Sequence, residues 1–405
     1  MTTSIAALNA VNFFMADVRD GLGPYLGVYL QQKNWSPAAI GLVMTVGGIA
    51  GMIATVPFGA LVDATRAKRA LMAIAAVATV VSSCLILVFP SFTATTIAQV
   101  ASGIAGAVIA PAIAGLTLGL VHQRGFAHQM GRNEAYNHAG NVIAALLCGL
   151  FGYLFGLVAV FVVMGAMAVL SLIALTFINP KDIDHRAARG AAEDSDAPVQ
   201  GIGIILSCKP LLVLAVTMLL FHLGNGAMLP LLGQSLASQG ADPSAYTSAT
   251  IIVAQLTMIP MALAAAWLAE RRGYWIVLIL ALVALPVRGG LAAVVTGPIG
   301  LFPVQMLDGV GAGLLGVAVP GLVARIMAGT GRVNLALGAV MTLQGIGASF
   351  SPSLGGWVAG EAGYAASFLA LGAVACVALV LWLVATPLVA ASCSVTPGKA
   401  ALERV

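Results

Sequence analysis

The sequence predicts an all-α membrane protein in which twelve transmembrane helices form two six-helix bundles. Three observations predict this fold class: the composition, the number of long apolar runs, and an internal repeat. The 405 residues are 60% hydrophobic and 8% charged, and their mean hydropathy is +1.03. A water-soluble domain could not bury that much apolar surface behind so few charges. The runs are continuous rather than alternating, which disfavours a β-barrel.

Apolar runs between polar breaks give twelve candidate helices, each near the roughly 20 residues that cross a bilayer. The first run lacks a basic leader and carries charged residues, so we expect a retained helix rather than a signal peptide. The expected spans are residues 5–30, 38–61, 70–89, 92–121, 135–155, 157–177, 211–236, 246–268, 275–295, 300–326, 335–358 and 365–391.

The basic residues orient these spans. With a cytoplasmic N-terminus, fifteen of the eighteen Lys and Arg residues fall in inner loops or tails. Only Lys33 falls in an outer loop, while Arg19 and Arg288 lie within spans. The positive-inside rule therefore predicts a multi-pass protein of the inner membrane with both termini in the cytoplasm. This distribution explains the net charge of +4 as topology, so we expect a lipid environment and no nucleic-acid partner.

The longest polar stretch, residues 179–201, follows the sixth span and holds the acidic residues Glu193, Asp194 and Asp196. It is typical of a mobile cytoplasmic linker between two halves. The predicted organisation is an N-terminal six-helix bundle at 1–178, a cytoplasmic linker at 179–208, and a C-terminal six-helix bundle at 209–405. We expect a monomer.

The two halves also repeat one another in sequence, at an offset of 206 or 207 positions. Agreement at three separate places predicts parallel structural repeats related by a pseudo-two-fold axis, as transporters have. The matched pairs are Leu61 with Leu268, Asp63 with Glu270, Gly140 with Gly347, Gly149 with Gly356, Gln99 with Gln305, and Ser102 with Asp308.

The loop after the second span carries a glycine, a leucine and an aspartate at every second position, followed by a basic cluster. These residues are Gly59, Leu61, Asp63, Lys68 and Arg69. On this motif, and along essentially its whole length, the chain resembles the major facilitator superfamily. Arg66 stands where that pattern usually has a second glycine, and Gln99 stands where many proton-coupled exporters have arginine. The resemblance implies alternating access: two bundles rock about a central cavity lined by spans one, four, seven and ten.

Each of those four spans carries a polar pair three residues apart, on one helical face. Polar side chains inside a bilayer are tolerated chiefly where they face a cavity or a partner. We therefore expect these pairs to line an aqueous path, and they are Asp17 with Asp20, Gln99 with Ser102, His222 with Asn225, and Gln305 with Asp308.

The first span suggests how protons could be coupled to transport. Asp17, Arg19 and Asp20 lie on one half of the helix, so desolvation and a nearby cation act on the carboxylates in opposite directions. A movement that changes the distance between them could load and release a proton. The candidate carboxylates are Asp20, Asp17 and Asp308, in that order. The alternative is a static ion-paired cluster that fixes helix packing.

Two further ionisable residues lie within spans. His222 is a candidate proton relay because its ordinary pKa is near neutrality, or it makes only an interhelical hydrogen bond. Arg288, close to Pro286, either serves as a cavity cation or extends toward the outer surface.

By the same resemblance, charges at the inner surface would form a gate that stabilises the outward-facing state. The alternative, topology-setting charge alone, explains the basic residues but not the matched carboxylates. The candidate gate residues are Gly59, Asp63, Arg66, Lys68, Arg69, Glu270 and Arg271. A polar stripe in the fifth span is expected to be interfacial; it comprises Glu134, Asn137, His138 and Asn141.

The function indicated is secondary active transport of a small polar or ionisable molecule, driven by protons. Export by an efflux antiporter is preferred to uptake, by analogy with similar compact carriers. The alternative within transport is an importer of an anion or zwitterion, with Arg19 and Arg288 as binding cations. An ATP-driven pump is disfavoured because no P-loop is visible. A membrane enzyme is disfavoured because no hydrolase motif is visible, and a sensor because the linker is too short to be a sizeable soluble domain. The five cysteines lack paired spacing, so neither a disulfide framework nor a zinc site is indicated. We expect no metal and no cofactor.

Overall fold

The computed structural model describes residues 2–20, 22–185, 187–189, 204–240, 242–295, 297–327 and 333–394. Within these ranges the regular structure is helical, with no β-strand. An all-helical chain is what a bilayer imposes, because a helix satisfies its own backbone hydrogen bonds. The predicted all-α class is confirmed. A few side chains inside helices, those of Asp20 and Asp63 among them, lie outside the described set.

Ten helical segments in the described ranges are long and apolar enough to cross a membrane. The count is two below the twelve predicted runs, and the causes are local. α1 (Thr2–Asp20) carries three charged residues, and it is followed at once by the short α2 (Leu22–Gln32). α13 (Val333–Val384) contains the eleventh predicted run and most of the twelfth, joined across Gly363, whose φ of 86° interrupts the helix.

Contacts divide the chain into two compact units. The first unit holds Met1–Ser195 with Leu236–Ile252, and the second holds Asp196–Ser235 with Val253–Val405. Compared with the predicted halves, the segment Leu236–Ile252 groups with the first unit. Two helices are divided between the units: α9 (Met228–Ser238) and α10 (Pro243–Arg272).

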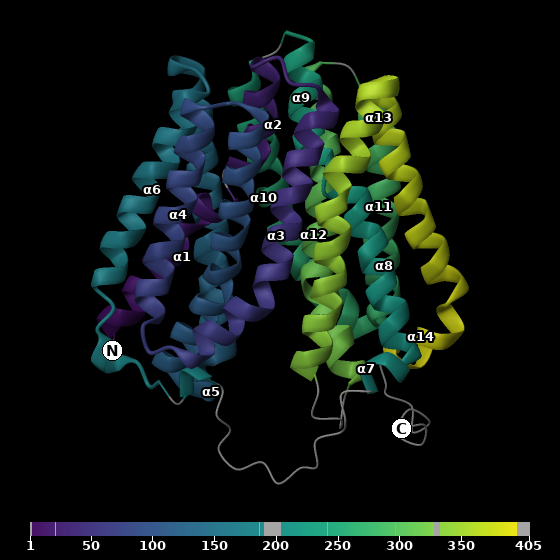
Figure 1. Ribbon diagram of the computed structural model, residues 1–405. Helices are drawn as coiled ribbons and strands as arrows, with labels where there is room; N and C mark the ends of the chain where they lie inside the picture. Colours follow the sequence, from purple (N-terminus) through teal and green to yellow (C-terminus); the bar gives the residue numbers. More distant parts are fainter. Residues whose placement is uncertain are drawn as a thin grey trace. The chain divides into compact units, whose positions relative to one another are not determined.

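Each unit is an assembly of long helices with short helical turns between them (Figure 1). In addition to α1 and α2, the first unit contains α3 (Pro37–Ala64), α4 (Lys68–Val88), α5 (Phe92–Phe155), α6 (Val158–Thr176), η1 (Pro180–Asp182) and η2 (Ala187–Arg189). In addition to α13, the second unit contains α7 (Ile204–Ser207), α8 (Lys209–Asn225), α11 (Tyr274–Val294), η3 (Pro298–Gly300), α12 (Leu301–Ile326) and α14 (Thr386–Cys393).

The first unit is organised around α5, which packs against α1, α3 and α4. α5 comprises two membrane-length segments, 92–122 and 129–155. They are joined at His122, whose φ of 54° is the left-handed conformation that few residues other than glycine adopt. The chain therefore turns back at this point, and both segments contribute to the core of the unit.

The break between α1 and α2 follows the local sequence. Gly23 and Pro24 occupy the first turn of α2, and proline cannot donate the backbone hydrogen bond that would continue α1. Beyond the break Tyr25, Leu26 and Val28 are buried in the core of the unit. The charged end of α1 therefore lies directly beside a helix terminus.

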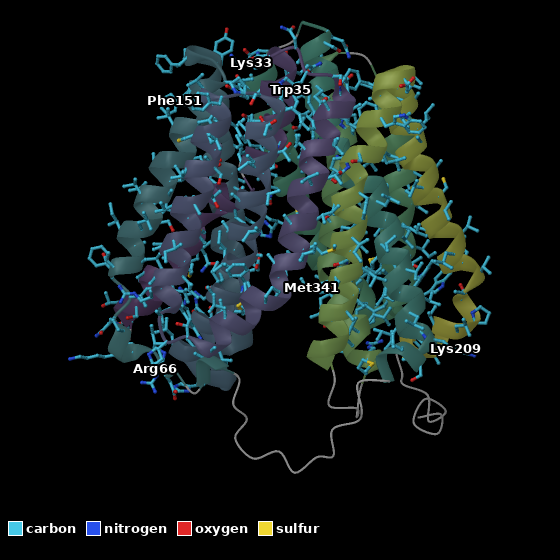
Figure 2. All side chains as sticks on the ribbon, viewed as in Figure 1. Lys33, Trp35, Arg66, Phe151, Lys209 and Met341 are labelled. Atoms are coloured by element: carbon cyan, nitrogen blue, oxygen red, sulfur yellow. The ribbon has the colours of Figure 1, made fainter. Side chains whose placement is uncertain are left out.

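Opposite ends of the first unit have different chemistry. At one end Ser36 and Ser91 accept hydrogen bonds from the N–H groups of Ala39 and Ala94, so they cap the N-termini of α3 and α5. Figure 2 shows Lys33 and Trp35 at this end and Arg66 at the other. The single basic outer residue predicted from the sequence is thus separated from the basic cluster by the length of the helices.

The first part of the predicted linker is packed against the first unit. The hydroxyl of Ser4 donates to Oδ2 of Asp182 at 2.6 Å and accepts the N–H of Asn179 at 3.1 Å. The N–H of Asp184 donates to the carbonyl of Gly119 on α5 at 2.8 Å. These contacts fix the described residues between 179 and 189 beside α1 and α5.

The segment Leu236–Ile252 lies against α2 and α5 within the first unit. Tyr25 and Ser248 share a hydrogen bond between their hydroxyls at 2.7 Å. Gly149 and Gly152 on α5 lie so close to Ser248 and Ser244 that an added Cβ would come within 2.7 and 2.5 Å of those side chains. We call this contact the serine seam.

In the second unit α8 packs along α13, and α11 packs against both α12 and α13. α8 ends at Asn225, and α9 begins only three residues later. The predicted seventh span is therefore a broken helix. Its break lies where the polar residues of the second unit converge.

Glycines bring the helices of each unit into backbone contact. A Cβ added at Gly140 would overlap the carbonyl oxygen of Phe13 on α1. The matched Gly347 meets the carbonyl oxygen of Leu219 on α8 in the same way. Small residues allow this close approach, on which helix association in lipid depends.

A second matched pair behaves alike. A Cβ added at Gly103 on α5 would overlap the carbonyl oxygen of Gly47 on α3. A Cβ added at Gly309 on α12 would lie 2.6 Å from the carbonyl oxygen of Ala254 on α10. The residues contacted are also matched, because Gly47 and Ala254 are 207 positions apart. The internal repeat therefore reflects equivalent helix crossings in the two units.

Replacing either Gly140 or Gly347 by alanine should destabilise the unit that contains it. We expect Gly140→Ala and Gly347→Ala each to cost about 1–3 kcal/mol, because the new methyl group overlaps a backbone carbonyl that cannot rotate away. The measurement is the midpoint of thermal unfolding in detergent.

Matched controls lie on the same helices, at Gly106→Ala and Gly345→Ala, where an added Cβ has no neighbour within 4 Å. These controls should be neutral or slightly stabilising, since alanine favours helix. Equal midpoints for all four variants would contradict the packing argument.

Candidate functional site

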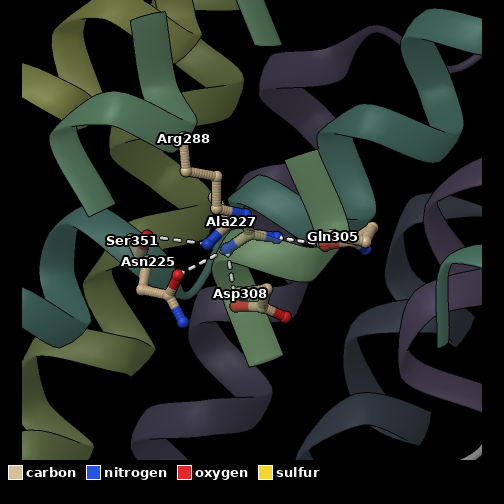
Figure 3. Close-up of polar contacts among 6 residues, drawn as sticks. All are labelled: Asn225, Ala227, Arg288, Gln305, Asp308 and Ser351. Atoms are coloured by element: carbon tan, nitrogen blue, oxygen red, sulfur yellow. Dashed lines mark hydrogen bonds and ion pairs between the residues drawn. The ribbon is translucent and has the colours of Figure 1, made fainter. Parts of the chain in front are cut away.

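The second unit contains a buried arginine surrounded by three polar side chains. Arg288 on α11 is 1% exposed. Its Nη1 donates to Oδ1 of Asn225 at 2.5 Å and to Oδ1 of Asp308 at 2.7 Å, and its Nη2 donates to Oε1 of Gln305 at 2.8 Å. Figure 3 shows the guanidinium group at the centre of these partners. We call these four residues the arginine cluster.

Three helices build the arginine cluster. Gln305 and Asp308 lie three residues apart on α12, so both project from one face toward α11. Asn225 is the last residue of α8, at the break before α9. Beside it the hydroxyl of Ser351 on α13 accepts the N–H of Ala227 at 2.8 Å. This bond satisfies a backbone donor that the broken helix would otherwise leave without a partner.

The arginine cluster pairs one cation with one carboxylate, a pairing that membrane interiors require. Its hydrogen bonds are incomplete, however. Nε of Arg288 and Nε2 of Gln305 are buried without a hydrogen-bond partner in the described part of the chain. The side chain of Asp308 is 19% exposed. The site thus offers buried donors and an accessible carboxylate, as binding of an acceptor-bearing molecule or a proton needs.

Three of the residues predicted from two polar pairs, together with Arg288, therefore meet at one point. Of the two alternatives for Arg288, the geometry favours the interior one, because the side chain is buried and ion-paired rather than extended toward a surface. Its pairing with Asp308 was not predicted, since α11 and α12 have no fixed register in the sequence alone.

His222 lies one turn before Asn225 but takes no part in the cluster's bonds. Its Nδ1 is 2.9 Å from the carbonyl oxygen of Met218 on the same helix. Its ring lies edge-on to Phe221, with 5.4 Å between the ring centroids. The relay role and the interhelical hydrogen bond both stay predictions.

The candidate residues of the first unit are distributed over α1 and α5. Asp17 is buried and lies close enough to Tyr25 and Cys148 to interact with them electrostatically. Arg19 is exposed, and the side chain of Asp20 is outside the described residues. Of the charged residues whose side chains the structure describes, Asp17 is therefore buried and Arg19 exposed, two residues apart on α1.

The polar pair of the fourth predicted span is half-buried. An added Cβ on Gly47 of α3 would lie 3.1 Å from Oε1 of Gln99, so this side chain lies along a helix crossing. Ser102 is half-buried one turn further on. Gln99 thus lies on the α5 surface that packs toward α3.

Two basic residues of the predicted gate cap helix ends. Nζ of Lys68, which is buried, donates to the carbonyls of Val62 and Thr65 at the end of α3. Nε of Arg69 donates to the carbonyl of Leu175 near the end of α6 at 3.0 Å. Cations at helix C-termini are favoured by the helix dipole. The sequence reasoning did not predict this role.

The remaining gate candidates, as far as their side chains are described, are exposed or half-buried. Arg66 is exposed, Gly59 is half-buried, and the side chain of Asp63 is outside the described residues. In the second unit Glu270 is exposed, and the guanidinium of Arg271 lies over the ring of Trp267 at 4.5 Å. Whether these residues form a gate stays a prediction.

Comparison with known proteins identifies the family. The model of the Major Facilitator Superfamily matches residues 4–302. The chain belongs to this superfamily. It is a multi-pass membrane transporter and not an enzyme, and the predicted family and fold class are confirmed.

The relatives support the same assignment. Uncharacterized MFS-type transporters from two strains of Mycobacterium tuberculosis, CDC 1551 / Oshkosh and ATCC 25618 / H37Rv, are 42% identical over 386 residues, which cover 94% of this chain and 92% of each relative.

Solved structures agree in fold. The nucleoside transporter NupG matches with a TM-score of 0.75 at 17% identity, covering 95% of this chain and 99% of NupG. A bacterial homologue of the human lysosomal transporter Spinster, in an inward-facing conformation, matches with a TM-score of 0.77 at 13% identity, covering 97% of this chain and 98% of the homologue. A D-xylose–proton symporter matches with a TM-score of 0.69 at 12% identity, covering 94% of this chain and 96% of the symporter.

Removing one partner of the buried ion pair should destabilise the second unit. We expect Asp308→Ala to cost about 3–5 kcal/mol, because it leaves an uncompensated cation in a buried site. The double variant Arg288→Met with Asp308→Ala should be more stable than Asp308→Ala alone. Thermal unfolding midpoints of both single variants, the double variant and the wild type complete the cycle.

Glu361→Ala is the matched control, because Glu361 is an exposed carboxylate on α13. It should leave the midpoint unchanged. Single-variant effects that add within about 0.5 kcal/mol would show that Arg288 and Asp308 do not interact.

Proposed function

We propose that this protein is a proton-coupled secondary transporter of a small polar or ionisable molecule, with export preferred to uptake. The observation that carries the proposal is the arginine cluster, where a partly exposed carboxylate, bound through Oδ1, holds a buried guanidinium. Ionisable residues within a membrane span are usually functional.

The arginine cluster supports coupling by competition for Arg288. A proton on Asp308 would remove the charge that holds Nη1, and the guanidinium would then be available to a substrate acceptor. Loss of the proton would restore the ion pair and displace that acceptor. Proton and substrate would thus favour different bonding partners of one cation, which is the differential interaction that coupling requires.

In this proposal Asp17 and Asp20 supply the corresponding carboxylates of the first unit. Asp17 is buried beside the break between α1 and α2, where a helix terminus offers backbone groups to a ligand. Of the three candidate carboxylates, Asp308 has the strongest support, because its cationic partner is identified. Gln99, Ser102 and His222 would complete the polar lining.

The serine seam supports alternating access. Ser244 and Ser248 pack against two glycines of α5, and Ser248 shares one hydrogen bond with Tyr25. Because all these side chains are uncharged, the contact can separate without breaking an ion pair. We place this seam on the outer side and the Lys68 and Arg69 caps on the cytoplasmic side of the inner membrane, following the positive-inside rule. Both termini would then be cytoplasmic, and a monomer would suffice.

The second candidate function is uptake of an anion or zwitterion. It is favoured by one observation, the buried Nε of Arg288 that has no hydrogen-bond partner in the described residues. A carboxylate could bind both Nε and a terminal nitrogen of the guanidinium. The solved relatives are a nucleoside transporter and a D-xylose–proton symporter among others, so polar solutes of several classes are candidates.

Asp308→Asn should uncouple transport from the proton gradient. The substrate for this test is chosen by thermal stabilisation of the purified protein with nucleosides, sugars, amino acids, carboxylates, antibiotics and metal chelates. In proteoliposomes with an imposed pH gradient, we expect the variant to lose about tenfold or more of the gradient-driven accumulation. Counterflow exchange should persist, because asparagine keeps a hydrogen-bond acceptor but cannot release a proton.

Glu361→Gln provides the matched control and should transport as the wild type does. Gradient-driven accumulation that is unchanged in Asp308→Asn would rule out this carboxylate as the coupling group. For protein inserted into the proteoliposomes in a known orientation, the side of the membrane on which the substrate accumulates decides between export and uptake.

Widening the serine seam should favour its open state. In a background without native cysteines, we expect Gly152→Leu to accelerate maleimide labelling of Ser248→Cys by about tenfold or more, because the larger side chain occupies the space of Ser244. Gly131→Leu on the same helix is the control, since an added Cβ there has no neighbour within 4 Å. Equal labelling rates in the two variants would contradict the seam as a moving contact.

A further inference from the structure

A cavity of about 520 Å³ lies in the first unit, between α1 and the second segment of α5. Its volume is in the range of small-molecule sites, about 300–1,000 Å³. No residue of the arginine cluster lines it. The lining residues are Thr2, Ile5, Ala6, Asn9, Ala10, Phe13, Phe14, Arg132 and Tyr136.

The polar groups of the cavity are mainly hydrogen-bond donors. Arg132 supplies a guanidinium group, Tyr136 a phenol and Asn9 an amide. Among the described residues that line the cavity, none is acidic, and Arg132 makes no ion pair within the described part of the chain. A cation beside neutral donors favours an anionic, acceptor-rich group.

The amide of Asn9 is held in one orientation by buried residues behind it. Nε2 of Gln129 donates to Oδ1 of Asn9 at 2.7 Å and to Oδ1 of Asn133 at 2.9 Å. Nδ2 of Asn133 donates to the hydroxyl of Thr117 at 2.8 Å, which donates in turn to the carbonyl of Ile113. Because Oδ1 of Asn9 is occupied, its Nδ2 is the group left for a ligand. Such a fixed donor lowers the entropic cost of binding.

The rest of the cavity is apolar. Phe13 and Phe14 lie edge to face, with 5.1 Å between the ring centroids, and Ile5 lies two turns before them on α1. Apolar and aromatic walls with a few placed polar groups are typical of sites for ligands that have an apolar body.

We propose that this cavity binds an amphipathic organic anion, with its carboxylate or phosphate against Arg132 and Asn9 and its apolar body against Phe13 and Phe14. No residue of the arginine cluster belongs to this site, and the inference does not depend on proton coupling. The same chemistry is present in two sources, a soluble aryl or alkyl anion and the headgroup region of an anionic lipid, and the experiment distinguishes them.

The test measures binding to the full-length protein in a neutral detergent, with phenylbutyrate as the anionic probe and phenylbutanamide as its neutral counterpart. We expect the carboxylate to bind at least about tenfold more tightly than the amide. Arg132→Gln should remove this preference, and added salt should weaken it. Arg132 is exposed, so the substitution should not impair folding.

Arg66→Gln is the matched control, because Arg66 is an exposed arginine of the same unit that does not line the cavity. It should bind phenylbutyrate as the wild type does. A lipid arm measures retention of phosphatidylglycerol against phosphatidylcholine by native mass spectrometry, in wild type and in Arg132→Gln.

Selective binding of phenylbutyrate that is lost only in Arg132→Gln supports the site with a soluble ligand. Retention of phosphatidylglycerol alone, lost only in Arg132→Gln, supports it with lipid as the source. Equal binding of acid and amide, equal losses in both arginine variants, or no binding of either anion would overturn it. None of these readouts measures transport, so failure of the proposed function would leave them unchanged.

Discussion

A bilayer interior offers no hydrogen bonds, and each level of this structure follows from that constraint. The backbone is helical because a helix satisfies its own donors and acceptors. Helices then associate without a hydrophobic driving force, so they depend on close packing, and glycines such as Gly140 and Gly347 bring backbones together. Polar side chains gather where they can satisfy one another, as they do around Arg288.

The constraint also explains why the two halves have kept the same contacts while their other residues differ. Gly103 with Gly47 and Gly309 with Ala254 place equivalent helices at equivalent separations. Few residues other than glycine fit where a neighbouring carbonyl occupies the space of a Cβ. Polar positions are freer to vary, since Ser102 in one half corresponds to Asp308 in the other. Duplicated architecture and divergent chemistry are thus compatible in one chain.

Much of the fold could be predicted from the sequence, because apolar runs and charge positions report directly on a bilayer. The break after Asp20 divides the first predicted run, and Gly23 and Pro24 account for it. The ends of α11 and α12 agree with the predicted runs to within a residue. By contrast, partners on different helices could not be predicted, because the rotation of each helix is set by packing. The ion pair of Arg288 with Asp308 is the main example.

Two other features could not be predicted from the sequence, for a different reason. Lys68 belongs to a motif that suggested a charge network, yet its ammonium group caps α3, which requires a buried path that only coordinates show. Gln129 and Asn133 were not singled out, because they precede the expected start of the fifth span. Both cases show that residues near predicted boundaries are the hardest to assign from pattern alone.

The serine seam has an energetic consequence. The hydroxyl pair of Tyr25 and Ser248 is neutral, and a hydrogen bond of this kind contributes about 0.5–1.5 kcal/mol. The flanking contacts on Gly149 and Gly152 involve uncharged side chains. In the proposed alternating-access cycle, opening this contact breaks no ion pair, so the free energy of opening should depend only weakly on ionic strength. In the proposed transport cycle, the position of this equilibrium would therefore stay nearly the same at low and at high salt.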